Sequence, residues 1–176
     1  MKITSKTGDG GYTGLPAGVR VSKDDPRIEC LGAVDELDAF LAAALLAGIS
    51  PRCAETLAAV RDELFAVIMP AIAGIPSRPA DTARLEERIA EIEARIHRDN
   101  GFVRAWTRPA PAALNVARTI CRRAEREAVT LSRSGTDGGA GRDGENGVTA
   151  YLNRLSDLLF LLALNEETAR PDNANG

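Results

Sequence analysis

The chain has 176 residues and a formal net charge of −3, and 44% of its residues are hydrophobic but only 4% aromatic. This length suits one domain with a sizeable core, and the slightly acidic balance argues against a nucleic-acid-binding surface. Alanine and leucine supply most of the apolar residues and, like glutamate and arginine, favour helices, so the composition predicts an all-α protein.

The first 26 residues are polar and glycine-rich, and residues 6–14 read KTGDGGYTG. Glycine permits positive φ angles and close approach of a ligand, and successive backbone N–H groups in such a turn can bind an anion. A lysine and two threonines add a positive charge and further donors. The stretch therefore predicts a phosphate-binding loop, although it lacks the GK[ST] ending of a Walker A motif. The alternative is a solvated terminal loop without a ligand.

Five long helices joined mostly by short loops are predicted, which indicates an up-and-down bundle. Their starts are marked by prolines or capping residues, and their apolar residues recur at helical spacing. In the first helix, Asp35 and Asp38 lie among apolar residues, and we expect Asp35 to pair with an arginine, either inside one subunit or across a subunit interface. The helices are expected at about 27–47, 51–73, 83–99 behind a cap at Asp81 or Thr82, 109–134 and 146–169.

The fourth predicted helix carries a row of charged residues. Arg118, Arg122, Glu125 and Arg126 are three or four residues apart and share a face, and Arg123 lies to one side. Guanidinium groups bind phosphate oxygens bidentately, and a carboxylate such as Glu125 can orient an arginine or approach a phosphate-bound Mg²⁺. The alternative is a solvated face with weak ion pairs, such as Arg122 with Glu125.

The fifth predicted helix is nearly all apolar, so most of its surface should be buried. Asn153 and Asp157 share one face of it, and buried polar groups need partners, which the arginines of the fourth helix can supply. A flexible linker over residues 135–147 precedes this helix. Together, the glycine-rich loop, the arginine row and this polar stripe predict a polyphosphate ligand such as ATP.

Three cysteines, Cys30, Cys53 and Cys121, lie far apart and form no CxxC pair, so we expect buried thiols rather than disulfides or a zinc site. The N-terminus lacks the apolar segment of a secretory signal, and the longest apolar run, residues 40–49, is too short to cross a bilayer. These features predict a soluble cytoplasmic protein that binds neither nucleic acid nor membranes.

Four stretches resemble, in the same order, the PduO-type ATP:cob(I)alamin adenosyltransferases: SKTGDGGYTGL, RVSKDDPRIECLGAVDELDAFL, ARTICRRAER and YLNRLSDLLF. The resemblance implies a five-helix ferritin-like bundle that assembles as a homotrimer with ATP at each interface. It implies transfer of the 5′-deoxyadenosyl group of ATP to the cobalt of cob(I)alamin, with Mg²⁺, giving adenosylcobalamin and triphosphate. A reductase and a B12-dependent enzyme are implied partners. One domain, 1–176, would comprise a nucleotide-binding segment 1–26, a bundle 27–169 and a flexible tail 170–176.

The resemblance also assigns roles by position. On the corrinoid side it implies an aromatic residue beneath the corrin, Phe102, and an intersubunit salt bridge between Asp35 and Arg118. Lys6, Lys23 and Arg122 are the implied catalytic residues, which stabilise charge on the leaving triphosphate. The implied ATP-binding residues are Ser5, Lys6, Thr7, Gly8, Thr13, Gly14 and Lys23 from one subunit, and Arg122, Arg123, Glu125, Arg126 and Asn153 from its neighbour.

Residues 102–111, FVRAWTRPAP, depart from the family pattern, which usually has a PGG turn after the aromatic residue. This departure motivates a second hypothesis, an ATP-binding sensor or partner protein on the same scaffold with a degenerate corrinoid site. A third hypothesis is a purely structural helical trimer, against which the polar stripes argue.

Overall fold

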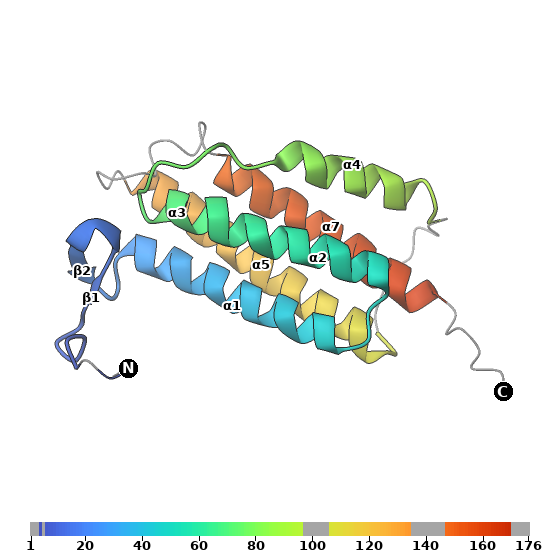
Figure 1. The fold of residues 1–176 in the computed structure, drawn as a ribbon, viewed down its shortest axis with the longest axis horizontal. Helices are drawn as coiled ribbons and strands as arrows, with labels where there is room; N and C mark the ends of the chain where they lie inside the picture. The colour runs from blue at the N-terminus through green and yellow to red at the C-terminus, as the bar shows by residue number, and fades with distance from the viewer. Residues whose placement is uncertain (1–3, 5, 97–105, 135–146, 170–176) are drawn as a thin grey trace.

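The computed structural model of the chain describes residues 4, 6–96, 106–134 and 147–169. Its helices form five rods that alternate in direction, as the colours of Figure 1 show. The predicted up-and-down bundle is therefore confirmed for this part of the chain. The predicted site residues Ser5 and Phe102, the linker over 135–146 and the tail over 170–176 lie outside the described residues.

Three helices make up the centre of the bundle: α1 (Pro26–Leu46), α5 (Pro109–Arg133) and α7 (Val148–Thr168). Helix α5 packs against α1 and against the antiparallel α7, and α4 (Thr82–Glu93) packs on α7. Within the described ranges, no helix is both long enough and apolar enough to cross a membrane.

The second rod runs through a proline. It consists of α2 (Pro51–Glu63), a π turn (Leu64–Ile68) and α3 (Met69–Ile72). Pro70 has no N–H, and in a regular α-helix its ring would crowd the carbonyl group four residues earlier. The wider π turn accommodates it, with the N–H of Met69 donating to the carbonyl of Leu64. The rod therefore ends close to its predicted end.

The third rod is shorter than predicted. Helix α4 ends at Glu93 rather than near residue 99. The N–H groups of Arg95 and Ile96 both donate to the carbonyl of Ile92, at 3.0 and 3.1 Å, so the last turn tightens and the helix stops. The start agrees with the prediction, because the Asp81 side chain caps the helix by accepting from the N–H of Arg84.

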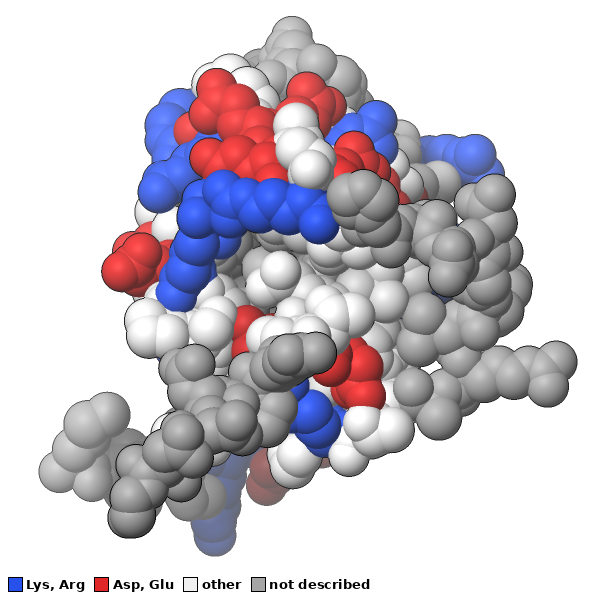
Figure 2. Space-filling view, turned by 90° about the vertical axis from the view of Figure 1, so that its right-hand side faces the viewer, with Lys and Arg blue, Asp and Glu red and all other residues white. Residues whose placement is uncertain are grey.

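Charged side chains gather over α4, at the top of the end-on view in Figure 2. Only Leu85 and Ile92 of this helix are buried. Glu91 accepts hydrogen bonds from Arg52 on α2 at 2.9 Å and from Arg88 on α4 at 2.5 Å. Helix α4 is therefore held by a narrow apolar stripe and by ion pairs at its edges.

The N-terminal segment folds into a hairpin, which the all-α prediction missed. Strand β1 (Tyr12–Gly14) pairs antiparallel with β2 (Arg20–Ser22), and the N–H of Lys23 donates to the carbonyl of Gly11 at 2.8 Å. The aromatic and β-branched residues in these strands favour the extended backbone. Figure 1 shows the hairpin outside the bundle, at the N-terminal end of α1.

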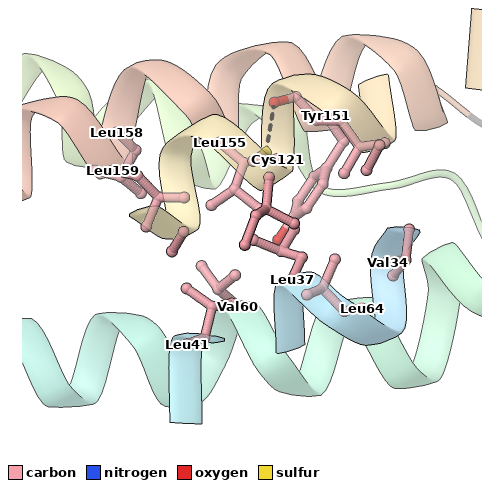
Figure 3. Packing of buried hydrophobic residues seen from close by; sticks show 14 of the residues in the cluster. Val34, Leu37, Leu41, Val60, Leu64, Cys121, Tyr151, Leu155, Leu158 and Leu159 are labelled. Atoms are coloured by element: carbon pink, nitrogen blue, oxygen red, sulfur yellow. Dashed lines mark hydrogen bonds between the residues drawn. The ribbon is translucent and has the colours of Figure 1, made fainter. Parts of the chain in front are cut away.

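The core lies where α1, α2, α5 and α7 meet, and Figure 3 shows its packing. All three cysteines are free and buried in it, as predicted. Cys121 donates to the carbonyl of Leu152 at 3.2 Å, and this contact joins α5 to α7. Burial, with the nearby Glu166 carboxylate, raises the pKa of Cys53 to about 12, so this thiol stays protonated near neutral pH.

Candidate functional site

Polar and aromatic side chains meet along the contact between α5 and α7. At one end, Nδ2 of Asn153 donates to Oε1 of Glu125 at 2.9 Å. At the other end, the Arg118 guanidinium lies over the ring of Phe160, 5.9 Å from its centroid. Because Glu125 follows Arg118 by seven residues on one helix, the two ends are about 10 Å apart. We call this group the α5–α7 seam; it comprises Asn115, Arg118, Arg122, Glu125, Asn153 and Phe160.

The arginines of α5 project where an anion can reach them. Arg122 and Arg126 are exposed, and Arg126 donates to the carbonyl of Arg122 at 2.9 Å. Among the described residues neither forms an ion pair, so the alternative of an Arg122–Glu125 pair is wrong. Arg123 lies to one side, as predicted, and pairs with Glu36 of α1.

The carboxylates of α1 and α7 differ in burial, and the prediction that Asp157 meets the arginines of α5 is wrong. Asp38 is buried and pairs with Arg61 of α2, at 2.6 and 3.0 Å. Asp35 and Asp157 are exposed. Asp35 lies about 60° around α1 from Asp38, and that rotation turns it from α2 to solvent. Asp157 lies toward α4, 3.6 Å from Arg154, and not toward the arginine row.

The hairpin region brings two predicted phosphate ligands together. A Cβ atom at Gly8 would lie 3.3 Å from Nζ of Lys23, so the amine rests against the glycine backbone. Lys6 has φ 59°, a left-handed conformation, and Arg20 donates to the carbonyl of Thr7 at 2.9 Å, which holds the turn on the hairpin. This group does not join the α5–α7 seam in the single chain, because the main packing partners of α5 and α7 are each other, α1 and α4.

The end of the seam near α5's first turn includes residues that sequence reasoning did not assign to a site. Trp106 meets Phe160 edge-on, with ring centroids 6.3 Å apart. The N–H of Thr107 donates to Glu167 at 3.1 Å, and Arg108 donates to the carbonyl of Ala169 at 2.9 Å. The part of the unusual 102–111 segment that is described is thus anchored on α7. In the sequence, the signal that could have indicated this part of the seam is Trp106, a tryptophan just before the start of a helix.

No three His, Cys, Asp or Glu side chains converge as a metal site within the described ranges. The seam carboxylate of Glu125 uses Oε1 to accept from Asn153. One carboxylate suits a magnesium ion that is held mainly by phosphates, and does not suit an all-protein metal cage. The contact between Glu125 and Mg²⁺ therefore stays a prediction.

The fold and the seam define a class: a helical bundle that presents arginines, a carboxylate and an amide beside an aromatic patch. The sequence matches the cobalamin adenosyltransferase family over residues 3–166. The chain therefore belongs to the cobalamin adenosyltransferase family, and the resemblance of the four stretches is confirmed.

Individual relatives agree with this assignment. The chain is 36% identical, over 95% of its length, to the corrinoid adenosyltransferase PduO of Citrobacter freundii, of which it covers 50%. It thus spans about half the length of the PduO relatives that it matches. It is 35% identical to another corrinoid adenosyltransferase of C. freundii, and this match covers 97% of both chains.

A solved structure shares the fold. It is a variant of the PduO-type ATP:corrinoid adenosyltransferase from Lactobacillus reuteri, complexed with cobalamin and ATP. Its TM-score is 0.77 at 30% sequence identity, and the match covers 92% of this chain and 89% of that one. The bundle of the present chain is therefore the bundle of that enzyme family.

Proposed function

We propose that this protein transfers the 5′-deoxyadenosyl group of ATP to the cobalt of cob(I)alamin and releases triphosphate. The observation that carries the proposal is the α5–α7 seam, which sets the Glu125–Asn153 pair about 10 Å from the Arg118–Phe160 pair, with the exposed Arg122 between Arg118 and Glu125 along α5. One end suits a nucleotide and the other a large, flat apolar ligand. The names of the relatives, and the ATP and cobalamin in the solved structure, support the same reaction.

The chemistry needs positioning and charge rather than a general base. The lone pair of Co(I) forms the new bond to C5′, while the C5′–O bond breaks and its electron pair leaves on the triphosphate. Holding C5′ in line with cobalt supplies much of the rate. Lys6, Lys23 and Arg122 would stabilise the charge that grows on the leaving group, and Glu125 would help to hold a Mg²⁺ ion that neutralises phosphate charge.

The proposed active unit is a homotrimer with a site at each interface. Gly8 and Lys23 lie together on the hairpin, apart from the seam of the same chain. A site that uses both groups is completed by a second subunit. The exposed Asp35 of one subunit would then pair with Arg118 of its neighbour on the corrinoid side.

A visible-absorbance assay tests the proposal. The protein is mixed with chemically reduced cob(I)alamin, ATP and Mg²⁺, and conversion to adenosylcobalamin is followed. ATP-dependent turnover is expected. If calorimetry shows ATP binding but no adenosylcobalamin forms, the ATP-binding sensor with a degenerate corrinoid site replaces the transferase. If neither binding nor turnover occurs, both assignments fail.

A further inference from the structure

Arg154 of α7 links the nucleotide end of the seam to α4. Its Nη1 donates to Oδ1 of Asn153 at 2.6 Å, and its Nε donates to Oε1 of Glu86 at 3.2 Å. Asp157, one turn further along α7, lies 3.6 Å from the same Nη1. Asn153 in turn donates to Glu125 on α5. A continuous line of polar contacts therefore crosses from α4 through α7 to α5.

These contacts select one orientation of the Asn153 amide. A carboxylate near neutral pH only accepts hydrogen bonds, and a guanidinium only donates them. Glu125 must therefore face the amide nitrogen, and Arg154 must face the amide oxygen. Turning the amide by 180° would set donor against donor and acceptor against acceptor. One N–H and one lone pair of the amide remain for a ligand, in directions that its two neighbours define.

The same contacts contribute little to the stability of the fold. The side chains of Arg154 and Glu86 are 42% and 57% exposed. Ion pairs this exposed are worth only about 0–1 kcal/mol. Helix α4 is already held on the bundle by Leu85 and Ile92, and at its edge by the Arg52–Glu91 pair. The arrangement is therefore better suited to orientation than to holding the helices together.

We propose that Arg154 is a positioning residue for the nucleotide, acting through the amide of Asn153, and that Glu86 anchors Arg154 from α4. The inference rests on the proposed function, because it takes Asn153 to be a nucleotide contact. An amide held in its binding orientation before ATP arrives loses less freedom when ATP binds. Arg154 and Glu86 would therefore tune the affinity for ATP without touching ATP.

The test measures KM for ATP in position 154 variants by the visible-absorbance assay. Arg154→Met keeps the aliphatic stem and removes the guanidinium, and we expect it to raise KM for ATP about tenfold, while KM for cob(I)alamin stays within about twofold. Arg154→Lys provides one ammonium that cannot span both acceptors, and an increase of about threefold is expected. An unchanged KM for ATP in Arg154→Met overturns the proposal.

A matched control and a double variant separate positioning from other roles. Glu87→Gln is the control. Glu87 is an exposed acid of α4, like Glu86, but it lines the groove between α2 and α4, and its substitution should keep the wild-type KM for ATP. Glu86→Gln should raise it about twofold, because it loses the charge of the anchor. In an Asn153→Ala background, adding Arg154→Met should change nothing further. A further increase would mean that Arg154 contacts the nucleotide itself, and it would overturn the proposed route.

Calorimetry and thermal unfolding keep the outcomes distinct. A wild-type chain that binds ATP without turnover refutes the transfer reaction, and the ratio of Kd values between wild type and Arg154→Met then judges the positioning role. A wild-type chain that does not bind ATP refutes both proposals. All variants are expected to unfold within about 2 °C of wild type, since the pairs are exposed. A drop of many degrees in Arg154→Met would indicate a structural role and overturn the positioning one.

Discussion

Among single residues, burial shifts the pKa values of two thiols, Cys53 and Cys121, and of the Tyr151 hydroxyl. Burial raises the pKa of Cys53 to about 12 and also raises those of Cys121 and Tyr151 above their ordinary values. None of the three is an assigned site residue. Their protonation therefore bears on the stability of the bundle rather than on the proposed reaction.

Raised acid pKa values predict a loss of stability at high pH. An unfolded thiol with a pKa near 9.0 releases its proton before the folded one does, so the free energy of the unfolded state falls relative to that of the folded state as pH rises. We expect the free energy of unfolding to be flat below about pH 8 and to fall above pH 9 by up to about 1.4 kcal/mol per pH unit for each thiol. Urea unfolding between pH 7 and 10 measures this.

Cys53→Ala is the informative variant for that measurement. It removes one of the two thiols whose pKa values are raised and should make the decline above pH 9 shallower, even though it lowers stability at every pH by opening a small cavity. A profile that stays flat to pH 10 in the wild-type chain would contradict the expectation.

The sequence predicted well which side chains lie together where a single helix determines the answer. Arg118, Arg122 and Glu125 share a face because they are three or four residues apart, and Arg123 lies beside them. It predicted poorly where a second helix decides. Asp157 lies toward α4, where it stays exposed, and not toward α5. The spacing of α7 residues does not show on which side of α7 the helix α4 packs.

Among the elements, the junction between the hairpin and α1 stands out. Asp25 caps α1, accepting from the N–H of Arg27 at 2.9 Å, and its carboxylate also pairs with the Arg27 guanidinium at 2.9 and 2.8 Å. This hydrogen-bonded guanidinium lowers the pKa of Asp25. Strand β2 ends only three residues before Asp25, so the cap fixes the direction of the chain between the hairpin and α1.

Removing the cap should affect both stability and ATP affinity. Asp25→Ala is expected to lower the free energy of unfolding by about 1–2 kcal/mol, the usual worth of an N-cap. It should also raise KM for ATP, because Lys23 lies two residues away. Urea unfolding and the adenosylation assay measure the two effects. Asp24→Ala, at the exposed neighbouring position, is the control, and equal effects of the two variants would disprove a capping role.

Helix starts were predictable because caps and prolines are local signals, as at Asp25, Ser50 and Asp81. The hairpin was not, because its strands have three residues each and glycines surround them. The π turn was also missed. The sequence shows Pro70 but does not show whether surrounding packing will break the helix there or widen it.

For the whole molecule, the separation of hairpin and seam predicts that subunits complement one another. Lys6→Ala damages the hairpin half of a site, and Arg122→Ala damages the seam half. Each variant alone should be nearly inactive. Refolded together in equal amounts, they should regain about a quarter of wild-type activity, because one interface in four joins two intact halves.

The control for this mixture uses two lesions in the same half. Arg122→Ala refolded with Asn153→Ala leaves every seam damaged, so no activity should return. Recovery in this control, or none in the Lys6→Ala mixture, would mean that the two halves are not contributed by different subunits.

Trp106 is the single tryptophan of the chain, and it lies edge-on to Phe160 at one end of the seam. All indole fluorescence of the protein therefore originates from the Phe160 end of the seam, and the Glu125–Asn153 pair lies at the other end. A molecule that absorbs near the indole emission band and binds at the Phe160 end will quench the fluorescence, whereas a nucleotide, which does not absorb there, will leave it nearly unchanged when it binds at the other end. The protein thus carries an intrinsic optical reporter, with which binding at the Phe160 end of the seam can be titrated without a label.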